Sequence, residues 1–157
     1  MIFVIVGSQK FPMNRLLEQM DTLIEAGAID EDVFAQTGCC TYQPKHYKGV
    51  AFLNKEEMEK KIDACSLLIC HAGSSSMMQG MKRGKKVIAV PRKAEYGEHV
   101  DDHQFELAST FCQAGYLLMA GDTSDLGERI ERSGSFVPKS YISSTNAYIE
   151  LLTSIIG

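Results

Sequence analysis

A glycine- and serine-rich segment stands directly after an apolar run in the middle of the chain, and it reads His71-Ala72-Gly73-Ser74-Ser75-Ser76. Glycine allows a ligand to approach the backbone closely. Free amides at the start of a helix, together with the helix dipole, attract phosphate, and the serine hydroxyls would add donors. Phosphate binding is therefore one interpretation, and the other is that the serines simply cap the helix.

A second glycine turn, Gly7-Ser8-Gln9, follows the apolar start of the chain. Alone it is a weak signal, because any glycine between a strand and a helix produces it. Two such turns at one edge of a sheet would be more informative. Neither turn continues into the Gly-Lys-Ser/Thr of a Walker A loop, and neither has the Gly-x-Gly-x-x-Gly spacing of an NAD fingerprint.

The densest group of polar side chains is the segment 98–104, Glu-His-Val-Asp-Asp-His-Gln. Three interpretations compete. His99 and His103 are four residues apart and could share a metal ion. His99 could be a general base oriented by an aspartate. Alternatively, an aspartate caps a helix whose first turn presents His103 and Gln104 to ligand hydroxyls. A metal would need a third protein ligand, and none is evident, so we expect no metal and no other cofactor.

A serine hydrolase could be drawn from Ser75, His99 and Asp102, but the Gly-x-Ser-x-Gly pattern is missing because residue 77 is methionine. The basic residues within 82–86 fall at the end of an expected helix, where cations complement the dipole. A solvated helix end is the simpler interpretation of them. Arg92 differs because it follows a strand-ending proline at the ligand edge, and we expect it to pair with a phosphate or carboxylate.

Apolar runs and helical periodicity alternate along the chain and would position these segments. The expected strands are 1–6, 32–37, 50–53, 66–70, 87–90 and 116–119, and the expected helices are 13–24, 54–62, 74–82, 101–113, 122–131 and 143–156. Asn54 should cap the second helix, with Glu57 in capping-box position. This alternation predicts an α/β fold, a Rossmann-like parallel sheet with helices on both faces. Ligands of such sheets bind at the carboxyl ends of the strands.

The length and composition set limits on function. The 157 residues correspond to one domain, and 45% hydrophobic residues indicate a globular chain. The net charge of −4 argues against a dedicated nucleic-acid-binding protein. We expect no membrane span and no signal peptide, because no apolar run approaches ~18 residues and no basic segment precedes the first one. Five cysteines without CxxC spacing indicate buried thiols in a reducing cytosol.

Several motifs, read in order over roughly residues 1–120, resemble the donor-binding domain of family 28 glycosyltransferases. They are His71-Ala72-Gly73, the run 84–91, Asp102-His103-Gln104 and Glu106-Leu107-Ala108. That family includes the bacterial enzyme that adds GlcNAc in lipid II synthesis and the small subunit of the two-subunit eukaryotic enzyme acting on dolichol-linked sugar. The runs 6–16 and 96–104 look closer still to bacterial capsule and exopolysaccharide subunits.

The resemblance implies that residues 1–157 form one half of a GT-B glycosyltransferase, a single UDP-sugar-binding domain. By resemblance, the contacts would be Gly7, Ser8, Gln9, Gly73, Ser74, Ser75 and Ser76 on the diphosphate, Phe52 and Leu53 on uracil, His103 and Gln104 on the sugar, and Glu98, His99 and Asp102 at the sugar end. Gln79 stands where the lipid II enzyme and the eukaryotic subunit usually have a ribose-binding glutamate. It can still form hydrogen bonds, but it lacks the charge.

The resemblance also implies an inverting transfer from a UDP-sugar to a lipid-linked saccharide in surface polysaccharide synthesis. The acceptor would be held by a separate membrane-associated subunit, which would keep this cytoplasmic chain at the membrane. Leaving-group charge would fall on helix amides and Arg92, and His99 is the one candidate base in this chain. The C-terminal segment 139–157 either docks the partner or covers the sheet. The alternatives are a non-catalytic nucleotide-binding regulatory or scaffolding subunit and a stand-alone hydrolase.

Overall fold

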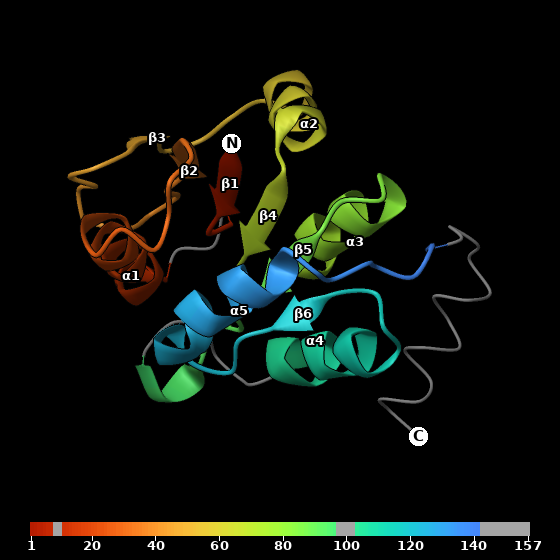
Figure 1. The fold of residues 1–157 in the computed structure, drawn as a ribbon. Coiled ribbons are helices and arrows are strands. Elements are labelled where there is room, and N and C mark those ends of the chain that lie inside the picture. Colours follow the sequence, from red (N-terminus) through yellow and green to blue (C-terminus); the bar gives the residue numbers. More distant parts are fainter. Residues whose placement is uncertain (8–10, 97–102, 142–157) are drawn as a thin grey trace.

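The computed structural model describes residues 1–7, 11–96 and 103–141. Six parallel strands form one sheet in the order β3-β2-β1-β4-β5-β6 (Figure 1). The strands are β1 (Ile2–Ile5), β2 (Val33–Gln36), β3 (Lys48–Val50), β4 (Leu67–Cys70), β5 (Val87–Ala89) and β6 (Leu118–Met119). The predicted Rossmann-like sheet is confirmed, and the strand order reverses direction between β1 and β4.

Helices connect the strands. They are α1 (Asn14–Glu25), α2 (Lys55–Ala64), α3 (Ser74–Lys82), α4 (His103–Gln113) and α5 (Leu126–Ser133), with short 3-10 turns at Ala94–Tyr96 and Thr123–Asp125. The helix expected over residues 143–156 lies outside the described residues, as does most of the segment 139–157. None of the helices in the described ranges is both long and apolar enough to cross a membrane.

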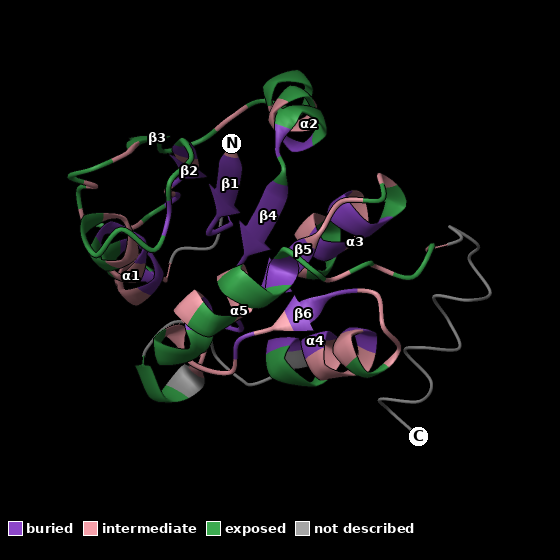
Figure 2. Cartoon of the chain, viewed as in Figure 1, coloured by how far each residue is buried: buried purple, intermediate pink, exposed green. Residues whose placement is uncertain are grey.

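The two faces of the sheet carry separate apolar cores, because alternate residues of a strand point in opposite directions. Ile2 and Val4 of β1 belong to the core that α1 and α5 cover, whereas Phe3 and Ile5 belong to the core under α2, α3 and α4. The strands are buried along their length and the helices are exposed on their outer sides (Figure 2). Helices therefore cover both faces, as the alternating pattern predicts.

The N-terminus of α2 forms as its sequence predicts. The side-chain oxygen of Asn54 accepts a hydrogen bond from the Glu57 backbone N–H at 2.8 Å, and the Asn54 amide donates to the Glu57 carboxylate at 3.1 Å. The first of these bonds satisfies a helix-end donor that would otherwise lack a partner, and the second joins the two side chains. Together they fix where α2 begins, and hence where the preceding Phe52 and Leu53 lie.

Two of the expected elements were wrong in their bounds. The strand expected over 50–53 runs instead from Lys48 to Val50, where it pairs with β2. Its three residues are all exposed, so this edge strand has no apolar pattern. The helix expected over 122–131 begins with the 3-10 turn, which Asp122 caps through the Thr123 backbone N–H at 2.7 Å. The α-helix itself starts at Leu126.

The cysteines are all free thiols, but they are not all buried as expected. Cys65 and Cys70 are buried, Cys40 and Cys112 are half-buried, and Cys39 is exposed. Burial raises the pKa of Cys70 to about 12 and also raises the pKa of Cys65. Both buried thiols therefore stay protonated and serve as small apolar core residues.

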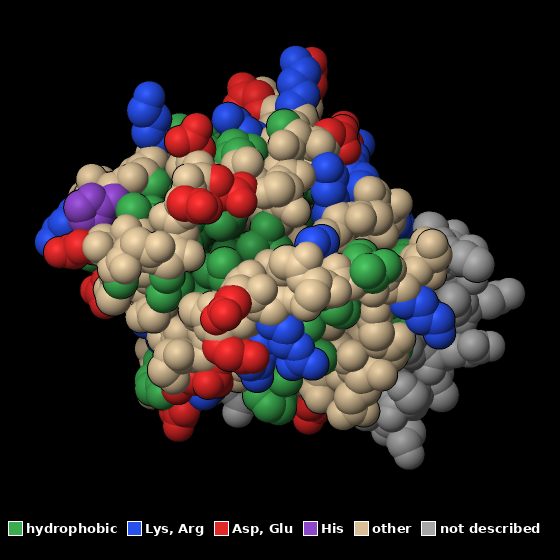
Figure 3. All heavy atoms as spheres, in the orientation of Figure 1, with side chains coloured by type: hydrophobic (Ala, Val, Ile, Leu, Met, Phe, Trp, Pro, Cys, Tyr) green, Lys and Arg blue, Asp and Glu red, His purple; other side chains and the backbone are tan. Residues whose placement is uncertain are grey.

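On the face of the described residues seen in Figure 3, basic and acidic side chains are interspersed and neither sign forms a continuous block. A continuous basic surface is the usual electrostatic footprint of a nucleic-acid-binding protein. This face carries none, and the net charge of the chain is −4.

A buried carboxylate anchors the loop between β2 and β3. Asp21, on the inner side of α1, accepts hydrogen bonds from the Tyr42 hydroxyl at 2.6 Å and from the backbone N–H groups of Lys45 and His46 at 2.9 Å each. Burial alone would raise the pKa of this carboxyl, but the three hydrogen bonds outweigh burial and hold the pKa below its usual value. The hydrogen bond from the Tyr42 hydroxyl to the same carboxylate is the main reason that the pKa of Tyr42 is raised to about 12.

Replacing this carboxylate should loosen the loop. Asp21→Asn leaves at least one of the three donors without an acceptor, and we expect a loss of about 2 kcal/mol in the free energy of unfolding. Because the native pKa is lowered, the wild-type advantage is complete above the unfolded value of about 4. It disappears as the pH falls through the native pKa. Urea denaturation across this range measures it. Glu18→Gln, an exposed carboxylate on the same helix, is the control and should cost little.

Candidate functional site

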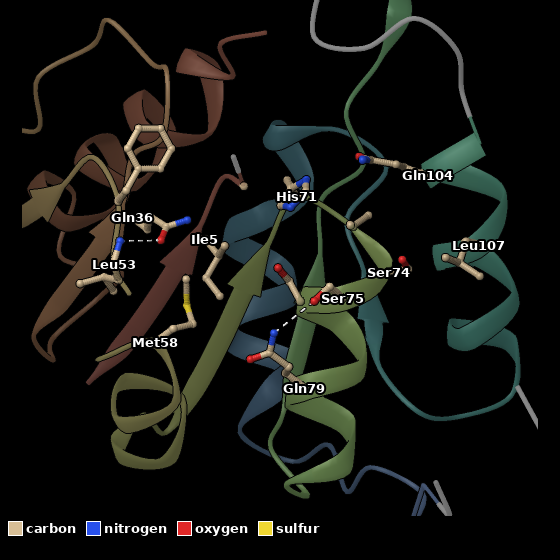
Figure 4. A pocket seen from close by; sticks show the side chains of 15 residues that line it. Ile5, Gln36, Leu53, Met58, His71, Ser74, Ser75, Gln79, Gln104 and Leu107 are labelled. Atoms are coloured by element: carbon tan, nitrogen blue, oxygen red, sulfur yellow. Dashed lines mark hydrogen bonds between the residues drawn. The ribbon is translucent and has the colours of Figure 1, made fainter. Parts of the chain in front are cut away.

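A cavity of about 620 Å³ opens at the carboxyl ends of the strands, beside the reversal between β1 and β4 (Figure 4). Ten of its lining residues are ones that the sequence singled out: Gly7, Phe52, Leu53, His71, Gly73, Ser74, Ser75, Ser76, Gln79 and Gln104. The other five lining residues were not among the predicted contacts: Ile5, Gln36, Met58, Ala72 and Leu107. The structure thus brings Gly7 and the segment 71–76 into one site.

His71 fills the space between those turns. A Cβ added to Gly7 would lie 2.6 Å from Nε2 of the imidazole, and a Cβ added to Gly73 would also lie 2.6 Å from it. Gly7 has a positive φ of 82°, which other residues rarely adopt. Both glycines are therefore required by the packing of His71, and the ring edge that carries Nε2 reaches the cavity between them.

The turn from β4 into α3 places amide groups at the same point. Ala72 is fully buried with a positive φ of 68°, a conformation of higher energy for a residue with a Cβ. The next residue, Gly73, is the N-cap of α3 and provides no side-chain hydrogen bond. The first-turn amides of this nine-residue helix therefore lack a capping side chain, and they face the cavity with the positive end of the helix dipole.

The serines do not act as the N-cap, which answers one question that the sequence left open. They lie inside α3, and Ser75 accepts a hydrogen bond from the Gln79 amide nitrogen at 3.2 Å. Figure 4 shows the carbonyl oxygen of Gln79 turned away from Ser75. That oxygen is left as an acceptor for hydroxyl groups, the role that a glutamate at this position would also have.

A more apolar end of the cavity is formed by the segment that precedes α2. Phe52 is 55% exposed, and Leu53 and Met58 lie beside it at the rim. Gln36, at the end of β2, is 4% exposed. Its side-chain oxygen Oε1 accepts a hydrogen bond from the Leu53 backbone N–H at 3.0 Å. No local sequence signal marks this glutamine as a site residue. Its hydrogen bond fixes Leu53, and the nitrogen of its amide points away from Leu53 (Figure 4).

Arg92 does not line the cavity. Its side chain is 1% exposed, and the guanidinium donates to the backbone carbonyls of Val6 and Phe11 and, from Nε, to Nδ1 of His71 at 3.4 Å. The sequence predicts an ion pair between Arg92 and a ligand at the edge of the sheet. In the structure the guanidinium instead points inward, toward backbone carbonyls and His71. The backbone N–H of Arg92 donates to the side-chain oxygen of Gln104 at 3.4 Å, which links α4 to the same cluster.

Several expected site residues lie outside the described ones: Ser8, Gln9, Glu98, His99 and Asp102. His103 is described only as the first residue of α4. Among the residues whose side chains are described, no three His, Cys, Asp or Glu groups come together as metal ligands. The assignment of a base and the absence of a metal stay predictions.

The doubly wound sheet and a site at its reversal define the class of this domain: it is Rossmann-like, with the architecture of one half of a GT-B glycosyltransferase. Residues 1–150 match the glycosyltransferase family 28 C-terminal domain. The chain belongs to this family.

Relatives and solved structures support that placement. The chain is 30% identical over 88 residues to the UDP-N-acetylglucosamine transferase subunit ALG13 of Yarrowia lipolytica, covering 53% of this chain and 43% of that protein. It is 28% identical over 87 residues to mouse ALG13, covering 52% of this chain and 7% of that protein. The chain thus spans less than half the length of both curated relatives.

Two solved structures share the fold. The solution structure of ALG13 has a TM-score of 0.66 at 17% identity and covers 99% of this chain and 96% of that one. The crystal structure of MurG from Acinetobacter baumannii has a TM-score of 0.58 at 17% identity, covering 84% of this chain and 40% of that one. At this level of identity, the likeness establishes the fold alone.

Comparing substitutions at Gly27 and Gly7 distinguishes the cost of backbone strain from the cost of a clash with His71, because the two glycines have similar φ values. Gly27 and Gly7 have positive φ values of 79° and 82°, but an added Cβ meets nothing within 4 Å at Gly27 and meets the imidazole at Gly7. We expect Gly27→Ala to lower the free energy of unfolding by about 1 kcal/mol and Gly7→Ala to lower it by more than about 2 kcal/mol. Urea denaturation measures both, and equal losses would contradict the packing described here.

Proposed function

We propose that this chain is the donor-binding subunit of a UDP-sugar glycosyltransferase. One observation carries the proposal: at the reversal between β1 and β4, Gly7, Gly73, the His71 imidazole and the N-terminus of α3 converge on one cavity. Neutral N–H donors aimed at a single point suit the oxygens of a diphosphate. Membership of family 28 supports the same ligand class.

The remaining walls suit the other parts of a nucleotide sugar. Phe52, Leu53 and Met58 offer apolar surface to a base, and Gln79 lies between that end and the α3 N-terminus with an oxygen that could accept from ribose hydroxyls. Gln104, the second residue of α4, lines the opposite part of the cavity (Figure 4). We assign it to hydroxyl groups of the transferred sugar. His103, Glu98, His99 and Asp102 are assigned to the same end by the family resemblance.

The reaction would be a direct, inverting displacement. An oxygen of the acceptor hydroxyl attacks the anomeric carbon, the bond from that carbon to the β-phosphate oxygen breaks, and UDP leaves with the bonding electrons. The amides of α3 and the imidazole N–H would stabilise the charge that grows on the leaving diphosphate. A base takes the acceptor proton. His99 is the candidate in this chain, and the acceptor-binding half is the other possible source.

One domain supplies one wall of a two-domain cleft, so the proposal includes a partner. Both curated relatives are described as subunits of a UDP-N-acetylglucosamine transferase. We infer a separate, membrane-associated subunit that holds a lipid-linked saccharide, with this chain on the cytoplasmic side. The sequence motifs of residues 6–16 and 96–104 support surface polysaccharide as the product.

Titration calorimetry with the isolated chain tests donor binding. We expect UDP to bind, and ADP, whose larger base carries no uracil-like carbonyl pattern, to bind at least about tenfold more weakly. Equal binding of the two nucleotides would contradict the base assignment. Absence of binding by both would contradict the donor site in this chain.

A substitution at Gln104 distinguishes binding of the sugar from binding of the nucleotide. Gln104→Ala should weaken UDP-sugar binding by about tenfold relative to UDP binding, because it removes a contact that only the sugar makes. Gln113→Ala, at the exposed end of the same helix, is the control.

Transfer activity measured with the partner subunit distinguishes a catalytic subunit from a non-catalytic regulatory subunit, the alternative that the uncharged Gln79 favours. Full transfer by the Gln104 variant would contradict the site.

A further inference from the structure

Arg92 is a buried cation whose hydrogen bonds hold the site from behind. The carbonyls that its guanidinium contacts belong to Val6 and Phe11, which stand on either side of the first glycine turn. Its third contact is Nδ1 of His71, at the start of the second turn. One planar group with five N–H donors can serve all three acceptors at once. Arg92 therefore ties together the ends of β1 and β4.

The contact with His71 also sets the proton on the imidazole. Arginine has no hydrogen-bond acceptor, so Nδ1 must accept the hydrogen bond from Nε and carries no proton. In a neutral imidazole the proton then resides on Nε2. Nε2 is the atom that an added Cβ at Gly7 or Gly73 would approach to 2.6 Å, so the N–H group lies between the two turns that line the cavity.

We propose that Arg92 is a positioning residue: it holds His71 as the Nε2–H tautomer, so that the imidazole donates a hydrogen bond to the diphosphate of the donor. The identity of this ligand rests on the function proposed above, whereas the Arg92–His71 contact belongs to the chain without ligand. Arg92 thus serves the anion without touching it. This role accounts for a cation that the sequence places at the ligand edge and the fold buries.

The first test reads the tautomer directly. In the ¹⁵N-labelled chain without ligand, at neutral pH, we expect NMR to show a proton on Nε2 of His71 and none on Nδ1. Arg92→Met should give a mixture of tautomers or a charged ring. Lys93→Met removes the neighbouring cation, which forms ion pairs with Glu95 and Asp122, and should leave the His71 spectrum unchanged.

Two results would overturn the proposal. One is a proton on Nδ1 in the unmodified chain, and this measurement needs no variant to fold. The other is an unchanged tautomer in folded Arg92→Met. Arg92→Lys keeps the charge and provides a second variant. One ammonium cannot reproduce the guanidinium contacts with Val6, Phe11 and His71 together, so this variant should also lose the single tautomer.

A double-mutant cycle on UDP affinity tests the consequence for the ligand. His71→Asn and Arg92→Lys should each weaken UDP binding about tenfold, the scale of one hydrogen bond to a charged group. If Arg92 acts through His71, adding Arg92→Lys to His71→Asn should weaken binding by less than about twofold more. Multiplicative losses would overturn the role. Absence of UDP binding by the unmodified chain would overturn the proposed function, and the tautomer would still decide the Arg92–His71 contact.

Discussion

The parallel pairing of β1 with β4 is the constraint on which the site depends. The two strands are buried along their whole length and end in register, Ile5 beside Cys70. Their following helices must then leave toward opposite faces of the sheet, since α1 packs against one core and α3 against the other. A crevice is unavoidable where two connections diverge in this way. The strand order brings Gly7 and the segment 71–76 together, and the contacts of His71 and Arg92 then fix how they sit.

Within that crevice, the available space limits which side chains can stand beside His71. His71 is accommodated because both neighbouring positions lack a Cβ, and Ala72 accepts a positive φ so that the chain can enter α3 at once. Each of these features lowers the free energy of unfolding, the glycines through conformational entropy and the alanine through backbone strain. The burial of the core strands offsets this cost. Such local strain at a site that the surrounding strands hold firmly is typical of positions where geometry serves a ligand.

The sequence predicted the sheet and singled out ten of the residues that line the cavity, because both depend on local signals. Apolar runs mark the buried strands, and the capping pair at Asn54 marks a helix start. The two glycine turns could be read without knowing their neighbours. Three features escaped for physical reasons. The edge strand Lys48–Val50 is exposed on all residues and has no apolar pattern. Gln36 acts through a hydrogen bond to a residue 17 positions away. Arg92 is expected at a surface by its charge, and its burial depends on backbone acceptors that lie 81 and 86 positions earlier in the chain.

The described lining of the cavity contains neither Lys nor Arg and neither Asp nor Glu, so recognition there depends on neutral donors and helix dipoles. This composition has a consequence for Gln79. A carboxylate at that position, one helical turn from the amides of α3, would add a negative charge beside a bound diphosphate, whereas glutamine keeps a hydroxyl acceptor without that repulsion. Oriented dipoles need no reorganisation as charge develops on a leaving group. In the proposed transfer, a charged clamp would also hold the leaving UDP more tightly than neutral donors would. A neutral, preorganised wall with the buried Arg92 held behind His71 would therefore suit the release of a diphosphate as well as its binding.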